Sequence, residues 1–387
     1  MENLLLDRLL GVKMIEIKEV ETEKDLDAFA SVVYDIYRDN PYYVFPLYND
    51  YKNYVKGNNN RLLSCPHKLF IAVKNNRTVG RIIAYIDQEL NSYHNSSIGY
   101  ISQYESIDDM EVAKALLDKC KEFFNYYNIK IMRGPVSLPD GDDNRGLLTN
   151  AFDELPSVMN VYNPPYYNDQ FIQYGFTLYH DVFAYKSDKD SLMNKIEKLS
   201  KLLPQIQKRY AYHTETVNLK NIDQVLKDVF EVLDKSIPAS WEDFIPVKKS
   251  DVRDIFEQMK SVVIEDLIVL AKNSKGEPIG FALTLPDYNE ILVDFKGKLN
   301  LINKIKFLFK KNKIKRVRMF VLMVVPEYRN KGVTSSIYYH VFKNAVKMGF
   351  TVLEGSTIWD YNKEMINDIE KFGAVKDKIY RVYQINL

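Results

Sequence analysis

Apolar and polar positions follow the same order twice along the chain. Residues 69–87 and 267–287 each contain an apolar run, a turn with Lys-Asn, and a second apolar run that opens near Gly80 or Gly280, a pattern typical of β-hairpins. Downstream in each half, two apolar runs flank a stretch of helical periodicity, which predicts strand, helix and strand. These elements are expected at 98–104, 111–124 and 129–133 in the first half, and at 317–325, 334–348 and 351–356 in the second.

Single landmarks also recur at a constant spacing. Gly175 and Gly373 are 198 positions apart, and so are Tyr185 and Tyr383. The first half carries an insertion over residues 134–163 that the second half lacks. A repeated order of unlike elements indicates two copies of one α/β domain.

We therefore expect two tandem domains, each a mixed, mostly antiparallel twisted sheet flanked by helices. The first is expected at 14–187 and the second at 211–387, with a Lys-rich amphipathic helix at 188–210 between them. Pro204 is expected to kink or end that helix. Residues 1–13 are interpreted either as a short amphipathic helix or as an extension upstream of the natural start.

Composition narrows the class of protein. A length of 387 residues suits two domains, and a net charge of +1 gives no overall attraction to nucleic acid. The two cysteines, Cys65 and Cys120, form no C-x-x-C pair, so we expect neither a disulfide scaffold nor a metal site. No apolar run reaches the roughly 20 residues of a membrane-spanning helix, and we expect a cytoplasmic protein without a membrane span.

The second half contains a turn suited to a phosphate. The apolar run 319–325 ends at Pro326, and a charged turn with Gly332 follows. Apolar residues then recur every four positions at Ile337, Val341 and Ala345, as on one face of a helix. The first N–H groups of such a helix have no partner inside it, and together with the helix dipole they can hold a phosphate. We expect a side chain at position 332 to block that approach.

Here the chain resembles the GNAT superfamily of N-acyltransferases. The segments "VVPEYRNKGVTSSIYYHVFKNA" and "TVLEGSTIWDYNKEMINDIEKFGA" are similar to its acetyl-CoA-binding core. The family pattern is Gln or Arg, two residues, Gly, one residue, and Gly or Ala, which corresponds here to Arg329, Gly332 and Thr334. The threonine departs modestly from the pattern. The resemblance covers the second half well and the first half in element order only.

The resemblance implies a site for acetyl-CoA or another acyl-CoA. Six backbone amides of the turn would bind the pyrophosphate, those of Arg329, Asn330, Lys331, Gly332, Val333 and Thr334. The preceding strand edge at Met323, Val324 and Val325 would pair with pantetheine, with the Val324 amide a candidate to face the thioester oxygen. Asn362 would contact the pantetheine arm.

The acid and base are less clearly marked. Many family members place a tyrosine four residues before the glycine that ends the helix, but this chain has Ile369 there. Tyr380 and Tyr383 are candidate substitutes, with core packing as the alternative. Glu354, mid-strand among apolar residues, is a candidate base, and a paired or exposed glutamate is the alternative.

Polar residues that follow the second hairpin are candidates for the acceptor pocket. They are Asp287, Asn289 and Glu290, together with Trp241 in "SWEDF", although both stretches can equally be turns. In the first half, Glu105, Asp108 and Asp109 occupy the phosphate position. Because carboxylates repel a pyrophosphate, we expect no coenzyme A to bind there in the usual way.

We expect an N-acyltransferase that moves an acetyl or other acyl group to a primary amine, with a small-molecule acceptor favoured. Two alternatives stay open: a synthase of acyl amines that takes its acyl group from an acyl-carrier protein, and a non-catalytic binder of coenzyme A or a metabolite. The basic segment 303–318 is interpreted as a solvated helix, or as a surface for coenzyme A phosphate or a carrier protein. The sequence leaves the oligomeric state open, a homodimer included.

Overall fold

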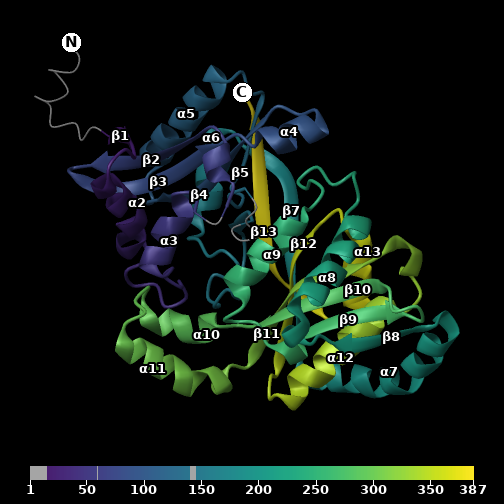
Figure 1. The fold of residues 1–387 in the computed structure, drawn as a ribbon. Coiled ribbons are helices and arrows are strands. Elements are labelled where there is room, and N and C mark those ends of the chain that lie inside the picture. The colour runs from purple at the N-terminus through teal and green to yellow at the C-terminus, as the bar shows by residue number, and fades with distance from the viewer. Residues whose placement is uncertain (1–14, 59, 140–144) are drawn as a thin grey trace, which may run out of the picture. The chain divides into compact units, whose positions relative to one another are not determined.

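The structure is a computed structural model that describes residues 15–58, 60–139 and 145–387 (Figure 1). The segment 1–13, interpreted above as a helix or an extension, lies outside these residues. The chain forms two compact units. The first contains the chain up to Asp181 with two later segments, Leu292–Asn300 and Tyr380–Leu387, and the second contains Val182–Ile291 and Leu301–Ile379.

The first unit is a sheet covered by helices. Its strands lie in the order β1 (Ile15–Glu19), β2 (His67–Lys74), β3 (Arg77–Tyr85), β4 (Ile98–Ser106), β5 (Ile131–Gly134) and the end of β13 (Val375–Asn386), and all neighbours are antiparallel except β4 and β5. The short β6 (Leu147–Leu148) also pairs with β13. The helices are α2 (Glu23–Ile36), α3 (Tyr48–Val55), α4 (Gln88–His94), α5 (Met110–Tyr126) and α6 (Tyr166–Tyr174).

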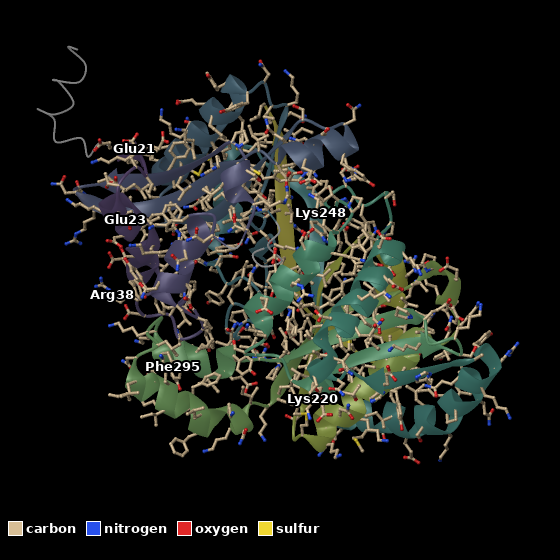
Figure 2. The ribbon with its side chains drawn as sticks, viewed as in Figure 1. Glu21, Glu23, Arg38, Lys220, Lys248 and Phe295 are labelled. Carbon is tan, nitrogen blue, oxygen red and sulfur yellow. The ribbon has the colours of Figure 1, made fainter. Side chains whose placement is uncertain are left out.

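Alternation along the strands builds two cores in this unit. Ile82 and Ala84 of β3 pack with residues of α5 and α6, whereas Ile83 and Tyr85 pack with residues of α2 and α3. Successive side chains of a strand point to opposite faces, so one sheet buries apolar residues on both sides. Charged side chains such as that of Glu23, at the start of α2, are exposed (Figure 2).

The second unit repeats this plan. Its strands lie in the order β8 (Tyr212–Thr216), β9 (Ile268–Asn273), β10 (Pro278–Pro286), β11 (Arg316–Val324), β12 (Val352–Trp359) and β7 (Thr177–Asp188, from Val182 in this unit). The β11–β12 pair is parallel and the others are antiparallel. The helices are α7 (Lys189–Tyr210), α8 (Ile222–Ser236), α9 (Lys249–Met259), α10 (Asn289–Leu292), α11 (Leu301–Lys310), α12 (Val333–Lys347) and α13 (Lys363–Lys371).

The predicted fold class is confirmed, because each unit has a mixed, mostly antiparallel sheet with one parallel pair joined through a helix. The expected linker helix is present as α7, which continues past Pro204 to Tyr210. The end of the last strand lies in a different unit from the one expected, since the second domain was expected to extend to residue 387. Residues from Tyr380 onward fall in the first unit, because β13 pairs there with β5 from Tyr383↔Gly134 to Asn386↔Ile131.

Candidate functional site

Two neighbouring strands of the second unit part from each other halfway along. The parallel register between β11 and β12 ends at the pair Met319 and Gly355, yet β11 continues to Val324 and β12 to Trp359. The register between β10 and β11 also shifts between Leu283 and Thr284, a β-bulge opposite the point of separation. We call the opening between the separated strand ends the fork.

The backbone of Val324 faces the fork. The N–H of Val325 donates to the carbonyl oxygen of Ile279, in β10, at 3.0 Å. Because backbone groups alternate between the two edges of a strand, the N–H and C=O of Val324 point to the opposite edge, where β12 has separated. The Val324 carbonyl accepts a hydrogen bond from Arg329 Nε at 3.3 Å. A fixed N–H donor is thus directed at the fork.

Helix α12 begins next to this strand with its N–H groups uncapped. Gly332 is the N-cap residue with φ 77°, and within the part of the chain that the structure describes no side chain caps the helix or adds a carboxylate to its first turn. The corresponding helix of the first unit, α5, is capped by Asp109, whose carboxylate accepts from the N–H of Glu111 at 3.0 Å. Of these two corresponding helix ends, that of α12 keeps the positive end of its dipole available to an anion.

The glycine at this turn also has a packing reason. A Cβ at position 332 would lie 2.8 Å from Cγ2 of Ile206 on α7 and 3.4 Å from the hydroxyl of Tyr212. The left-handed φ and the close approach of α7 both favour glycine. A side chain at position 332 would therefore point toward α7. From the sequence we expected instead that it would block the approach of a phosphate.

The turn before α12 is fixed by Arg329. Its guanidinium donates to the carbonyl of Ser236 at the end of α8 at 2.9 Å and lies 3.6 Å from the carboxylate of Glu364 on α13. Asn330 is exposed with φ 60°, and the ammonium group of Lys331 lies 5.0 Å from the ring centre of Tyr328. The turn thus connects the ends of three helices beside the fork.

Helix α13 completes this side of the fork. Asn362 caps α13, accepting a hydrogen bond from the N–H of Met365 at 3.2 Å. The Thr334 hydroxyl bonds to the Asp368 carboxylate, and burial raises the pKa of that carboxyl although this bond acts in the opposite direction. Val333 is buried at the start of α12. These contacts bring the predicted residues of the turn and Asn362 into one neighbourhood.

Aromatic side chains lie beside Asn362. The ring of Tyr361 is stacked on that of Trp359, with centroids 5.5 Å apart, and lies 6.0 Å from the ring of Trp241. Trp241 in turn contacts Phe244 at 5.3 Å. Of the four residues proposed for the acceptor, Trp241 therefore belongs to this neighbourhood.

A buried charged network lies where β11 and β12 are still paired. Glu354 is fully buried, accepts a hydrogen bond from Ser356 Oγ at 2.7 Å and faces Arg316 at 3.9 Å. Arg318 donates from Nε to Ser356 Oγ at 2.9 Å, and Arg316 is paired with Asp287 at 2.9 Å. From the sequence, Glu354 and Asp287 were candidates for separate roles. The sequence did not identify Arg316 and Arg318, which complete the network. Their spacing of two residues, which puts both on one face of an apolar strand, was the available signal.

Comparison with known proteins adds to this geometry. No family model matches the chain. "Protein YghO" of Escherichia coli strain K12 is 25% identical over 369 residues, which is 94% of this chain and 93% of that protein. "Bacterial ceramide synthase" of Caulobacter vibrioides is 24% identical over 380 residues, 96% of this chain and 97% of that protein.

Solved structures share the fold of this chain. A tandem GNAT protein from the clavulanic acid biosynthesis pathway matches with a TM-score of 0.58 and 11% identity, covering 96% of this chain and 98% of that one. The chain has the tandem GNAT fold. The glucosamine N-acetyltransferase region of a fungal multi-domain GH3 β-N-acetylglucosaminidase also matches with a TM-score of 0.58 at 12% identity, and this chain spans 38% of that protein's length.

The other predicted acceptor residues of the second GNAT unit hold its backbone together. The Glu290 carboxylate accepts from the N–H groups of Lys315 and Arg316, at 3.0 and 2.8 Å. Asp287 accepts from the N–H of Asn289 at 3.2 Å. These contacts lie at the start of β11, the end away from Val324, so the structure does not bring these three residues to the fork.

The candidate tyrosines lie in the first GNAT unit. The Tyr383 hydroxyl donates to Asn168 Oδ1 at 2.9 Å, and its ring lies 5.5 Å from Phe171 in the core. Tyr380 is buried on the same strand opposite Leu148. For both residues, the structure shows the packing that the alternative interpretation describes.

The first GNAT unit also has separated strands, but its own chain occupies the gap. The β4–β5 register ends at Tyr100 and Arg133, and the N–H of Val136 then donates to the carbonyl of Ile101 at 2.9 Å. Glu105 is buried, and its carboxylate accepts from two tyrosine hydroxyls, at 2.7 Å from Tyr37 and 2.8 Å from Tyr167. The chain's own segment after β5 therefore pairs with β4 just past the point where the two strands separate.

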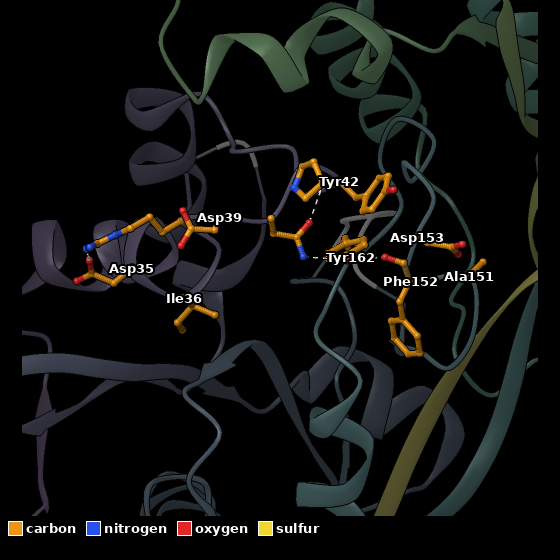
Figure 3. Close-up of a pocket in the computed structure, with 11 residues that line it drawn as sticks. Asp35, Ile36, Asp39, Tyr42, Ala151, Phe152, Asp153 and Tyr162 are labelled. Carbon is orange, nitrogen blue, oxygen red and sulfur yellow. Dashed lines mark hydrogen bonds and ion pairs between the residues drawn. The ribbon is translucent and has the colours of Figure 1, made fainter.

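A pocket of about 680 Å³ lies elsewhere in the first unit (Figure 3). Its lining includes Asp35, Asp39, Tyr42, Phe152, Asp153 and Tyr162. The Tyr162 hydroxyl donates to the carbonyl of Phe152 at 2.7 Å and accepts from Asn40 Nδ2 at 2.9 Å. These bonds connect the segment after α2 to the insertion.

Over the described ranges, with their gaps at 59 and 140–144, no three His, Cys, Asp or Glu side chains are grouped as metal ligands. Over the same ranges no helix combines the length and the apolar character needed to cross a bilayer.

Proposed function

We propose that the second GNAT unit transfers an acyl group from an acyl-CoA thioester to a primary amine by direct attack. The observation that carries this is the fork, where the Val324 N–H points at an open edge beside the uncapped end of α12. A fixed donor and a nearby anion-binding helix end are what a CoA thioester requires.

The residues present fit such a donor in their chemistry. The Arg329 N–H donates to the carbonyl of Pro326 at 3.2 Å, so the N–H groups from Asn330 to Thr334 are the candidates for a pyrophosphate. No acidic residue lies in the first turn of α12. The edge of β11 from Met323 to Val325 is the candidate pairing partner for the pantetheine arm, which Asn362 would contact from the start of α13. Bound coenzyme A supplies an activated acyl group and a thiolate leaving group.

Within this proposal the protein's main chemical contribution is electrostatic. The Val324 N–H would stabilise negative charge on the thioester oxygen as the amine attacks. Glu354 is buried in a network with Ser356 and Arg316, so we assign it to holding the strands at the fork rather than to proton transfer.

A long-chain amine is the acceptor class that we favour. The curated relative that is a bacterial ceramide synthase aligns over 96% of this chain, and a ceramide is an amide of a long-chain amino alcohol. The rings of Trp241, Trp359 and Tyr361 would offer an apolar contact next to the fork. This favours a lipid amine as the acceptor, whereas the sequence alone favoured only a small molecule over a protein.

Ser335, at the third position of α12, is the site for a decisive substitution. Glutamate at this position suits a helix N-terminus, so Ser335→Glu should leave the fold stable while placing a negative charge at the pyrophosphate. Calorimetric titration of acetyl-CoA and palmitoyl-CoA should show binding to the unmodified protein and at least a tenfold weaker binding to Ser335→Glu. The control Ser335→Gln, of the same shape without charge, should bind almost as the unmodified protein does.

Turnover then tests the reaction itself. Release of free thiol should require both acyl-CoA and an amine, and long-chain amino alcohols should exceed short amines of equal basicity. No binding to the unmodified protein would contradict the coenzyme site and point to a carrier-protein donor. Tight binding without thiol release with any amine would support the non-catalytic alternative instead.

A further inference from the structure

Helix α11 exposes its apolar residues to solvent. It covers Leu301–Lys310, and none of its residues is buried. Five large apolar side chains are exposed, with relative accessibilities of 74% for Leu301, 64% for Ile302, 47% for Ile305, 61% for Leu308 and 78% for Phe309. A monomeric soluble domain rarely exposes so many large apolar groups on one short element.

These five side chains form one continuous face. At about 100° per residue, they fall within an arc of about 120° around the helix axis. Lys304 and Lys306 flank this arc on its two sides. The helix is therefore amphipathic, but its apolar face is directed to solvent.

The opposite side of α11 contacts the protein. Phe307 is the partly buried apolar residue of the helix, and its ring lies 5.5 Å from the ring of Tyr288. The Tyr288 hydroxyl donates to the carbonyl of Val262 at 2.9 Å. Because the helix is already anchored through Phe307, the exposed arc is not needed to attach it to its unit.

The charge around the arc is of one sign. Residues 301–316 contain no Asp or Glu and carry six lysines, Lys304, Lys306, Lys310, Lys311, Lys313 and Lys315. The whole protein has a net charge of only +1, so this is a local concentration of positive charge. An apolar face bordered by lysines is the composition of helices that lie in the plane of a membrane surface.

We propose that α11 docks the protein on a bilayer surface rich in anionic phospholipid, with its exposed apolar arc in the headgroup and upper acyl region. The helix has 10 residues, half the roughly 20 of a spanning helix, which is why it would lie on the membrane. A second copy of this chain is a poorer partner, because α11 packed on α11 would bring two sets of lysines together. An acidic protein would match the lysines and leave the arc of five apolar side chains without a matching surface.

This inference does not depend on the proposed function, because membrane binding is measured without donor or acceptor. Both could also hold together. A protein held at the surface by α11 would meet amines and acyl chains that reside in the bilayer.

Vesicle flotation tests the proposal with the full chain. The protein should float with vesicles of phosphatidylcholine and phosphatidylglycerol at 3:1, bind far less to pure phosphatidylcholine, and lose binding as salt is raised. Ile305→Asn with Leu308→Asn should weaken binding at least tenfold, and so should Lys304→Gln with Lys306→Gln. Because these side chains are exposed, the urea midpoint of unfolding should not change.

Helix α7 offers matched controls, since it is also Lys-rich and exposes apolar residues. Met193 and Leu202 are 43% and 51% accessible but lie nine positions apart, on opposite sides of the helix. Met193→Asn with Leu202→Asn, and Lys198→Gln with Lys201→Gln, should bind vesicles as the unmodified protein does.

A fluorescent reporter locates the contact. Phe309→Trp should show a blue-shifted emission with anionic vesicles and quenching by brominated acyl chains. The proposal is overturned if the unmodified protein does not bind anionic vesicles, or if the α7 controls lose as much binding as the α11 variants. It is also overturned if the α11 variants instead dissociate a dimer or an acidic protein partner without affecting vesicle binding.

Discussion

Substitution of Glu354 by glutamine tests whether this carboxylate has a structural or a catalytic role. The side chain is fully buried, accepts from Ser356 Oγ at 2.7 Å and lies 3.9 Å from Arg316. Glutamine keeps the volume and the bond from Ser356 but removes the charge. We expect Glu354→Gln to destabilise the second unit and to change activity only as far as the fork is disturbed.

The size of the effect follows from the distance. With an effective dielectric constant of about 20, unit charges 3.9 Å apart attract by about 4 kcal/mol before desolvation is counted. The cost of burying the carboxylate offsets much of this. Because Arg316 keeps its pair with Asp287 in the variant, we expect a net loss of about 1–3 kcal/mol. With a urea m-value of about 2 kcal/mol/M, a loss of about 2 kcal/mol lowers the midpoint by about 1 M.

The chain contains a suitable probe for this measurement. Both of its tryptophans, Trp241 and Trp359, lie in the second unit, so their fluorescence reports the unfolding of the unit that contains Glu354. Glu257→Gln, which removes an exposed carboxylate paired with Lys260, is the control and should change stability by less than about 0.5 kcal/mol.

One result would refute the structural role. If Glu354→Gln unfolds at the same urea concentration as the unmodified protein while its acyl transfer falls a hundredfold or more, the carboxylate acts in proton transfer. A lowered midpoint with near-normal turnover in the folded fraction supports the network.

Two further predictions concern residues away from the fork. Tyr383→Phe loses the hydrogen bond to Asn168, so the free energy of unfolding of the first unit, measured by circular dichroism in urea, should fall by about 0.5–1.5 kcal/mol. The kcat/KM for acyl transfer should stay unchanged. A large fall in kcat would instead make Tyr383 a catalytic candidate again. Burial lowers the pKa of His340, whose ring contacts Thr214 and Thr216, below the unfolded value of about 6.5, so the unfolded chain takes up the proton first. The tryptophan-reported stability should therefore fall as the pH drops from about 7 toward 5, and His340→Gln should fall less; an equal fall in both would contradict this assignment.

Local pattern was sufficient for much of this fold. Periodicity predicted β11, α12 and β12 to within a few residues, and the repeated order of elements predicted two copies of one domain. The glycine at 332 predicted the turn, and in the structure Gly332 adopts the left-handed conformation at the N-cap of α12. The first half has Asp109 at the corresponding place, and the structure shows its carboxylate capping α5.

Tertiary packing decided what surrounds those elements. The side chain of Ile206, more than a hundred positions from Gly332, lies where a Cβ at position 332 would point, and the sequence did not reveal this packing reason for the glycine. Tyr383 matched Tyr185 in spacing, but β13 carries it into the core of the first unit. Glu290 and Asp287 were candidates to bind an acceptor, but in the structure both carboxylates contact Arg316 at the start of β11.

The sequence by itself thus determined which segments are strand, turn and helix and where an anion-binding helix end can occur, because these depend on neighbours a few residues away. Only the tertiary structure decided that β11 and β12 separate after Met319 and Gly355, and that α11 directs its apolar face outward. Both depend on which distant segments meet. No local periodicity distinguishes an apolar arc that packs on a core from one that faces solvent.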